Sequence, residues 1–297
     1  MKILKTFFLV ALFCQSLNLL AQDDLDALLD EITEERVEYV TGAFKSTRVI
    51  NLQSVEKIGA NTLDFRISHR FGALDGGAYE LFGLDQATIR FGLEYGVNDW
   101  LMVGIGRSTY EKTYDGFVKA LLLRQSKGKR YMPISLAYFS AATINSLRWQ
   151  NPERENYFSS RMAYVHQLII ASKISKELSL QLSPTVVHKN LVRTKEDLNT
   201  NYALGFSGRM KVTNRTSINA EYIYRIPPPV KTESFTAFYN SLSVGVDIET
   251  GGHVFSLHVS NSLPMIEKGF IMETNKSWLK NGIHFGFNIS REFAFKK

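Results

Sequence analysis

The sequence predicts an all-β protein: a transmembrane, antiparallel, up-and-down β-barrel of about 12 strands, within a range of about 10 to 14, preceded by a short amphipathic helix. Three observations carry this prediction. Segments of about ten residues alternate between apolar and polar or small side chains, short connections alternate with long ones, and aromatic residues gather at the segment ends. A soluble sandwich or a soluble barrel explains the alternation, but not the strand length, the connection pattern or the aromatic ends.

The alternation is clearest in residues 86–110, which read as two strands joined by a three-residue turn at 97–99. In a strand, successive side chains point to opposite faces. One face of the first strand carries large apolar groups, namely Ala87, Ile89, Phe91, Leu93 and Tyr95. The other carries small or polar groups, namely Thr88, Arg90, Gly92, Glu94 and Gly96. An apolar outer face and a polar inner face are typical of a membrane-spanning hairpin.

The N-terminus reads as a secretory signal peptide over residues 1–21, with Lys2 and Lys5 before an apolar run that ends at Ala21. Acylation of Cys14 is an alternative, but the bulky Phe13 before it suits a lipoprotein site poorly. Cys14 is the single cysteine. A mature chain that begins at Gln22 therefore excludes disulfides, thiolate catalysis and cysteine-bound metals.

Residues 22–40 predict an acidic periplasmic helix, because Leu25, Leu28, Leu29 and Ile32 follow helical spacing. This helix is either an amphipathic leader packed on the periplasmic end of the barrel, or an acidic handle for a periplasmic partner or a plug. Residues 41–61 follow as a connector that is too polar to face lipid, and we interpret them as a candidate lumen plug. Residues 62–297 form the predicted barrel.

The barrel strands are expected in alternation with short and long connections. Their expected ranges are 62–71, 87–96, 100–110, 115–124, 131–143, 160–172, 178–188, 201–212, 217–225, 237–249, 253–262 and 282–295. Residues 125–130 read as a short basic turn, and residues 263–281 as a long loop. Outer-membrane barrels have short periplasmic turns and longer outer loops. The pattern therefore places both mature termini on the periplasmic side of the cell outer membrane.

Aromatic residues mark the expected membrane interfaces. They are Tyr95, Trp100, Tyr110, Phe293 and Phe295. The last strand ends in aromatics, which resembles the signal that the barrel-assembly machinery reads, although two lysines follow Phe295. Expected partners are thus outer-membrane lipid, the assembly machinery, and a periplasmic or surface protein.

Four stretches, residues 43–51, 63–72, 83–107 and 114–125, together resemble an uncharacterised domain-of-unknown-function family of Gram-negative outer-membrane β-barrels. The resemblance covers mainly residues 40–140. It implies a barrel and a compartment, and no activity comes with it.

Charged residues on the inner face are the candidate functional residues. The lumen-lining candidates are Arg66, Arg70, Arg90, Glu94, Arg209, Glu221, Arg225 and Asp247. Inside a barrel such groups must be satisfied by water or by opposite charge. They line a path for polar solutes, or they fill the barrel as salt-bridged ladders. A barrel of about 12 strands lies between filled and open ones, so size does not decide.

Other functions have little support in the sequence. Six histidines lack zinc-type spacing, and the serines lack a nucleophile motif, so no catalytic residue, metal or cofactor is expected. Loss of Lys2 and Lys5 takes the net charge from +6 to +4, too little to predict nucleic-acid binding.

The sequence favours a small pore or transporter for polar solutes that is not an enzyme. The alternative is a non-conducting barrel that binds a partner through its outer loops or N-terminal helix. A plug formed by residues 41–61 would argue against free diffusion.

Overall fold

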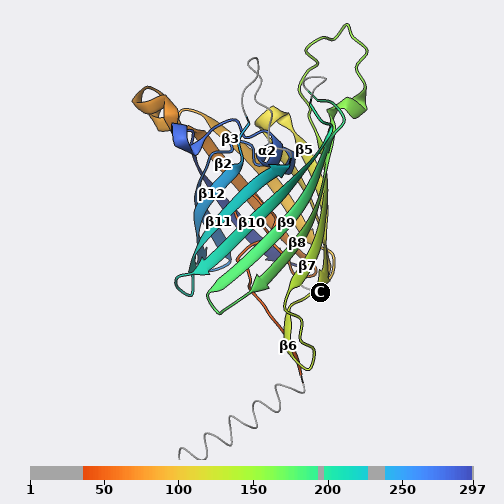
Figure 1. Cartoon of the computed structure of the whole chain (residues 1–297), viewed down its shortest axis with the longest axis vertical. Coiled ribbons are helices and arrows are strands. Elements are labelled where there is room, and N and C mark those ends of the chain that lie inside the picture. Colours follow the sequence, from red (N-terminus) through yellow and green to blue (C-terminus); the bar gives the residue numbers. More distant parts are fainter. Residues whose placement is uncertain (1–35, 193–196, 227–237, 296–297) are drawn as a thin grey trace, which may run out of the picture. The chain divides into compact units, whose positions relative to one another are not determined.

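A computed structural model describes residues 36–192, 197–226 and 238–295 of the 297-residue chain, which form a closed barrel and a small separate sheet (Figure 1). The barrel has twelve antiparallel strands, and each pairs with the next along the chain until β14 pairs with β2. The strands are β2 (Thr62–Ala73), β3 (Ala87–Gly96), β4 (Leu101–Ser108), β5 (Tyr114–Leu123), β7 (Ser135–Ile144), β8 (Met162–Lys173), β9 (Leu178–Lys189), β10 (Thr200–Lys211), β11 (Thr216–Ile226), β12 (Ser241–Thr250), β13 (His253–Ser260) and β14 (His284–Ala294). The predicted up-and-down barrel of twelve strands is confirmed.

Burial along the strands follows the period of two. In β11 the buried side chains are Ser217, Asn219, Glu221, Ile223 and Arg225, whereas the intervening side chains are exposed or half-buried. The exposed set includes large apolar groups such as Ile218, Tyr222 and Tyr224. In β11 the inward side chains are therefore polar except for Ile223, and the large outward ones are apolar, which is the pattern predicted for a barrel whose exterior faces lipid.

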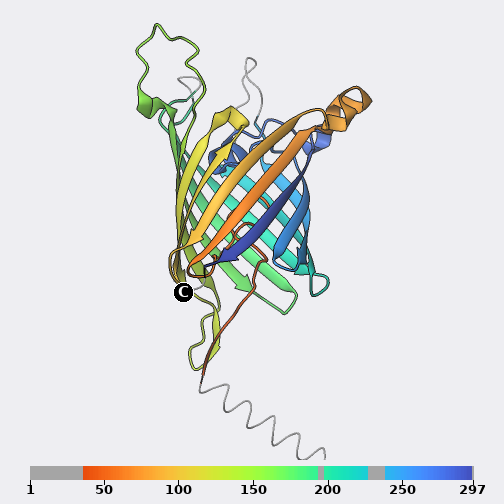
Figure 2. The same cartoon turned by 180° about the vertical axis from the view of Figure 1, so that it is seen from behind.

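The two ends of the barrel differ in the length of their connections (Figure 2). At one end, called here the short-turn end, the connections include residues 97–100, 174–177, 212–215 and 251–252. At the opposite, long-loop end, they include residues 74–86, 145–161 and 261–283. The chain enters β2 and leaves β14 at the short-turn end, because Thr62 pairs with both Gly96 and Ala294.

Short helices occur only in connections of the described chain. They are η1 (Leu74–Gly83), η2 (Tyr110–Lys112), η3 (Phe158–Arg161), α2 (Glu267–Met272) and η4 (Trp278–Lys280). No helix among the described residues is both long and apolar enough to cross a bilayer.

Residues 36–40 and 124–133 form a compact unit of their own. Here β1 (Val37–Tyr39) pairs with β6 (Ser126–Gly128) in antiparallel register, and the Arg124 guanidinium lies 4.8 Å from the Tyr39 ring centre. The helix predicted over residues 22–40 is therefore wrong at 37–39, and residues 22–35 lie outside the described chain. Val37 and Tyr39 are residue types that favour strands. They pair with β6, which lies within residues 125–130, the segment expected to be a short basic turn.

Candidate functional site: a plugged lumen

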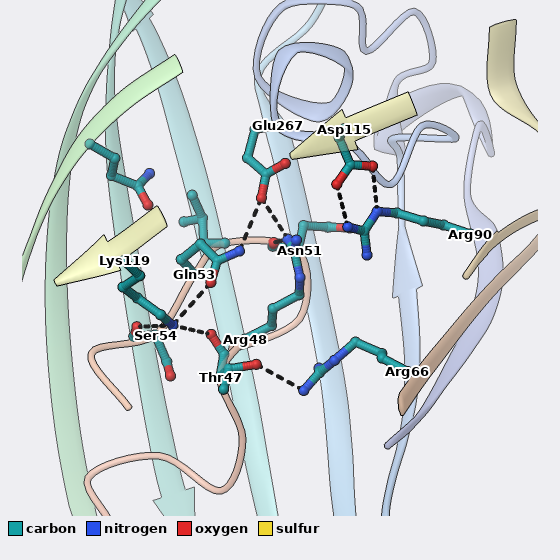
Figure 3. A network of polar contacts seen from close by, with 12 residues as sticks. Thr47, Arg48, Asn51, Gln53, Ser54, Arg66, Arg90, Asp115, Lys119 and Glu267 are labelled. Carbon is teal, nitrogen blue, oxygen red and sulfur yellow. Dashed lines mark hydrogen bonds and ion pairs between the residues drawn. The ribbon is translucent and has the colours of Figure 1, made fainter. Parts of the chain in front are cut away.

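Residues 47–54 fold as a tight hairpin inside the barrel, called here the plug hairpin (Figure 3). The amide of Ser54 donates to the carbonyl of Thr47 at 2.9 Å, and the amide of Val49 donates to the carbonyl of Leu52 at 2.8 Å. All eight residues of the hairpin are buried. The connector between residues 41 and 61 thus enters the barrel from the short-turn end, turns at residues 50 and 51, and returns to β2.

The hairpin tip is held by one carboxylate of the barrel wall. Glu221 of β11 accepts hydrogen bonds from the backbone amides of Ile50, Asn51 and Leu52 at 3.0–3.3 Å. It also accepts one from the Asn51 side chain at 2.7 Å. A buried carboxylate is tolerated when donors surround it, and hydrogen bonds to a charged acceptor are stronger than neutral ones. The three tip amides therefore have a hydrogen-bond acceptor inside the barrel in place of water.

The Asn51 side chain connects the tip to two further wall residues. Its Nδ2 donates to the hydroxyl of Ser243 at 3.0 Å, and its Oδ1 accepts from the Arg70 guanidinium at 2.9 Å. Arg70 also donates to the carbonyl of Ser262 at 2.5 Å. The tip therefore contacts strands β2, β11 and β12 at once.

The two arms of the hairpin are held from the opposite wall by Lys119 of β5. Its Nζ lies 2.8–3.2 Å from four oxygens: the carbonyls of Thr47, Ser54 and Glu56 and the Oε1 of Gln53. Figure 3 shows this lysine reaching across to the hairpin from its strand. Because every oxygen belongs to residues 47–56, this buried cation interacts with the plug rather than with the wall.

Below the tip, Thr47 joins the hairpin to a charged cluster on β2 and β3. Its hydroxyl donates to Glu94 at 2.6 Å and accepts from Arg66 at 2.9 Å, and Arg66 also pairs with Asp64 at 3.2 Å. Four of the predicted lumen residues, namely Arg66, Arg70, Glu94 and Glu221, thus bind the plug hairpin directly. They are ligands of the plug in this structure and do not face an open channel.

The start of the connector is fixed at the short-turn end. Arg209 donates to the carbonyls of Gly42 and Ala43 at 3.0 and 3.2 Å, and Lys45 pairs with Glu249. Phe44 and Ile58, on either side of the hairpin, are buried in an apolar cluster. The wall residues of that cluster include Phe117, Phe139, Val165 and Ile169.

A second segment enters the lumen from the long-loop end. The connection between β13 and β14 contains α2, all six residues of which are buried. Arg225 of β11 donates to the carbonyl of Met272 at 3.0 Å, and Phe270 and Ile271 join the same apolar cluster. The expected long loop over residues 263–281 therefore contains a short buried helix, Glu267–Met272.

The plug hairpin and α2 meet at Glu267. Its carboxylate pairs with the Arg48 guanidinium at 2.9 Å and accepts from the Gln53 side chain at 3.1 Å (Figure 3). Both carboxylate and guanidinium are buried. Segments that enter from opposite ends of the barrel are thus joined by one buried ion pair.

All eight predicted lumen residues are buried on the inner face of the wall. Besides the five that contact residues 41–54, Arg225 binds α2, Arg90 pairs with Asp115 at 2.5 Å, and Asp247 is buried in β12. Of the predicted interface aromatics, Tyr95, Trp100, Phe293 and Phe295 lie toward the short-turn end, and Tyr110 lies in η2 at the long-loop end.

Sequence reasoning missed three groups of this site: Lys119, Glu267 and the polar residues of the hairpin itself. Lys119 follows Asp115 and Phe117 at the period of two on the inner face of β5, which is a usable signal. Glu267 had no such signal, because six residues are too few to show a helical period.

We predict that Glu267→Gln loosens the hairpin and α2 together. The substitution removes the charge opposite buried Arg48, and the loss of one partner of a buried pair costs roughly 3–5 kcal/mol, less for an amide that still hydrogen bonds. Hydrogen exchange should therefore speed up in both residues 47–54 and residues 267–272. The matched control is Glu273→Gln, which removes the carboxylate that pairs with Lys189 and Lys268 directly after α2. Faster exchange in α2 alone in both variants would contradict the coupling.

A closed twelve-stranded barrel with an apolar exterior, and with a lumen filled from both ends, defines a plugged membrane β-barrel. The chain belongs to the membrane bound beta barrel domain family (DUF5777), whose model matches residues 44–293. The match begins within the connector, so the family's shared region includes the plug hairpin as well as the wall.

Several solved outer-membrane proteins are similar to the chain at low identity. The KdgM porin is 12% identical with a TM-score of 0.44, and covers 79% of this chain and 99% of its own. The outer membrane protein Omp33 of Acinetobacter baumannii is 10% identical with a TM-score of 0.43, over 78% and 98%. The outer membrane phospholipase A of Escherichia coli is 11% identical with a TM-score of 0.41, over 78% and 91%. No curated protein sequence matches the chain.

Proposed function

We propose that this protein is a gated barrel of the outer membrane, which passes small polar solutes only when the plug hairpin leaves the lumen. The observation that carries the proposal is the hairpin held inside the barrel by Glu221, Lys119 and Arg66, all of them wall residues with charged side chains. In this proposal the short-turn end faces the periplasm and the long-loop end faces outward.

The chemistry of the contacts favours a movable plug over a permanent filling. The ion pairs and hydrogen bonds that hold the hairpin replace interactions with water, so their net contribution is far smaller than their number suggests. Once the hairpin leaves, the charged wall groups regain water and offer a polar path beside the apolar wall residues of the cluster. Charged groups of this kind along a lumen suit polar solutes.

The direction of exit also agrees with gating. Residues 41–43 lie at the short-turn end, where Arg209 and Lys173 bind their carbonyls. The hairpin is continuous with this end and can withdraw through it without passing the wall. A periplasmic partner that binds the N-terminal segment would have the reach to shift the hairpin.

The test is single-channel conductance of the refolded protein, from Gln22 onward, in a planar bilayer, with and without residues 22–61. The full chain should be silent or open rarely, and the deletion should show stable steps, because it removes the plug. Heat-modifiable mobility on a gel must show that both are folded barrels. Silence in both folded proteins would overturn the pore proposal.

One observation favours a second function, a non-conducting barrel that binds a partner through its outer loops. In η1, Leu81 and Phe82 adopt positive φ of 46° and 53° and are more than half exposed, and Leu279 in η4 is also more than half exposed. Bulky residues rarely take this conformation, and exposed apolar clusters mark interaction surfaces. If the barrel without residues 22–61 shows no conductance, this second function becomes the better supported one.

A further inference from the structure

A groove of about 530 Å³ lies on the outer surface of the barrel, across strands β8 to β12. Its outward-facing lining is apolar, with Ile170, Leu182, Phe206, Tyr222 and Leu242 among the side chains. The groove therefore belongs to the face that lipid covers in a membrane-bound barrel, and it is separate from the lumen site.

The strand register shows why the surface is hollow here. Leu180 of β9, Gly208 of β10 and Ala220 of β11 are successive neighbours across the sheet and face outward. Gly208 has no side chain and Ala220 has a single methyl group, so two adjacent outward positions are small. The next outward row is Leu182, Phe206, Tyr222 and Leu242, all of them large. The small pair forms the floor, and the large row forms a wall.

The backbone does not require glycine at this position. A Cβ on Gly208 would meet only Leu180 Cδ2 at 3.5 Å and the Ser179 carbonyl at 3.9 Å, which are ordinary contacts. By contrast, a Cβ on Gly104 would lie 2.4 Å from the Phe117 ring. What Gly208 provides is empty space on the outer face.

The dimensions and chemistry of the groove match an extended hydrocarbon chain. Strands lie about 4.8 Å apart, so a groove that crosses five of them is about 19 Å long. One leaflet is about 15 Å of the roughly 30 Å hydrocarbon core, and a path that crosses strands tilted by about 35–45° is itself inclined to the bilayer normal, so the groove fits within the depth of one leaflet. We propose that this groove binds one fatty acyl chain of a membrane lipid and holds it on the barrel wall.

A second copy of the chain is a poorer occupant than a lipid. Stable protein interfaces bury about 1,200–2,000 Å² and need complementary protruding side chains on the partner. The groove floor is a single row of residues and is continuous with the rest of the lipid-facing surface. A flexible chain from the surrounding bilayer fills such a channel without any partner surface.

The proposal is independent of gating and is tested by native mass spectrometry. The protein is reconstituted in nanodiscs of a single synthetic phosphatidylcholine and then released stepwise. The wild type should keep one phospholipid under conditions that strip the rest, and Gly208→Leu should lower its retention about tenfold, a difference of about 1.4 kcal/mol. Ala220→Leu fills the same floor and should act likewise. The control is Gly116→Leu, because Gly116 of β5 also faces outward with room for a Cβ.

The outcomes separate the occupants. Equal retention in the wild type, Gly208→Leu and Ala220→Leu, each with heat-modifiable mobility, would overturn the proposal. Loss of a dimer, and not of a lipid, in the two filled variants would assign the groove to a second copy and would also overturn it. Replacement of the phospholipid by a fatty acid of the same length should preserve retention, because the chain is the proposed ligand. Failure of the free fatty acid to bind would refute a site for the chain itself.

Discussion

A disulfide between plug and wall should close the barrel permanently. Asn51 and Ser243 are in hydrogen-bond contact at 3.0 Å, one on the hairpin tip and one on β12. In a chain from Gln22 onward, which has no cysteine of its own, Asn51→Cys with Ser243→Cys gives a single pair to oxidise. The oxidised protein should show no conductance, and reduction should restore the openings of the unlocked protein, measured in the same planar bilayer.

Ser243 also supplies the control for this lock. Its hydroxyl lies 2.8 Å from that of Ser260 on the neighbouring strand β13, so Ser243→Cys with Ser260→Cys joins two wall strands and leaves the hairpin free. The variant with this second pair should show the same conductance when oxidised and when reduced. If oxidation of the plug-to-wall pair leaves the openings unchanged, the hairpin is not the gate.

The barrel could be predicted because every strand repeats one local rule. In β11, for example, the residues from Ser217 to Arg225 alternate between the lumen and the lipid face, and a membrane allows no other pairing of such strands than closure. The rule acts within a few residues, so it is visible in the sequence without knowledge of the partners.

The contents of the lumen could not be predicted to the same degree. The inner-face charges were visible from periodicity, but their partners depend on where a nonrepetitive segment folds. Arg66 and Glu94 lie 3.9 Å apart on the inner face, but each also binds Thr47, which the strand pattern does not indicate. The helix α2 illustrates the same limit, because its stability comes from burial among wall residues and not from its own six residues.

The small sheet shows a different limit. Residues 37–39 continue the charged pattern of the expected helix, yet they pair with residues 126–128, almost ninety residues later. Pairing between strands so far apart in the sequence cannot be seen from neighbouring residues. The prediction instead followed the helical spacing of the residues before 37. Val37 and Tyr39 favour a strand, but three residues are too few to distinguish a short strand from the end of the expected helix.

Removal of the carboxylate at Glu221 should free the hairpin tip. In Glu221→Ala three backbone amides and the Asn51 side chain lose their acceptor inside the barrel, and breaking such a buried charged contact costs roughly 3–5 kcal/mol. Each 1.36 kcal/mol is tenfold, so exchange of the amides of residues 50–52 should become roughly a hundredfold to several thousandfold faster. Hydrogen exchange with mass spectrometry measures this directly.

Glu221→Gln separates the charge from the hydrogen bonds. The amide keeps one acceptor oxygen for the tip and loses the charge, so its exchange rates should fall between those of the wild type and Glu221→Ala. Glu153→Ala, at an exposed position in the loop between β7 and β8, should change nothing. Because the same contacts hold the gate closed in our proposal, the order of exchange rates should also be the order of open probability in the bilayer. Fast exchange at the tip without added conductance would mean that the hairpin fills the lumen loosely but does not control passage, and would count against gating by this segment.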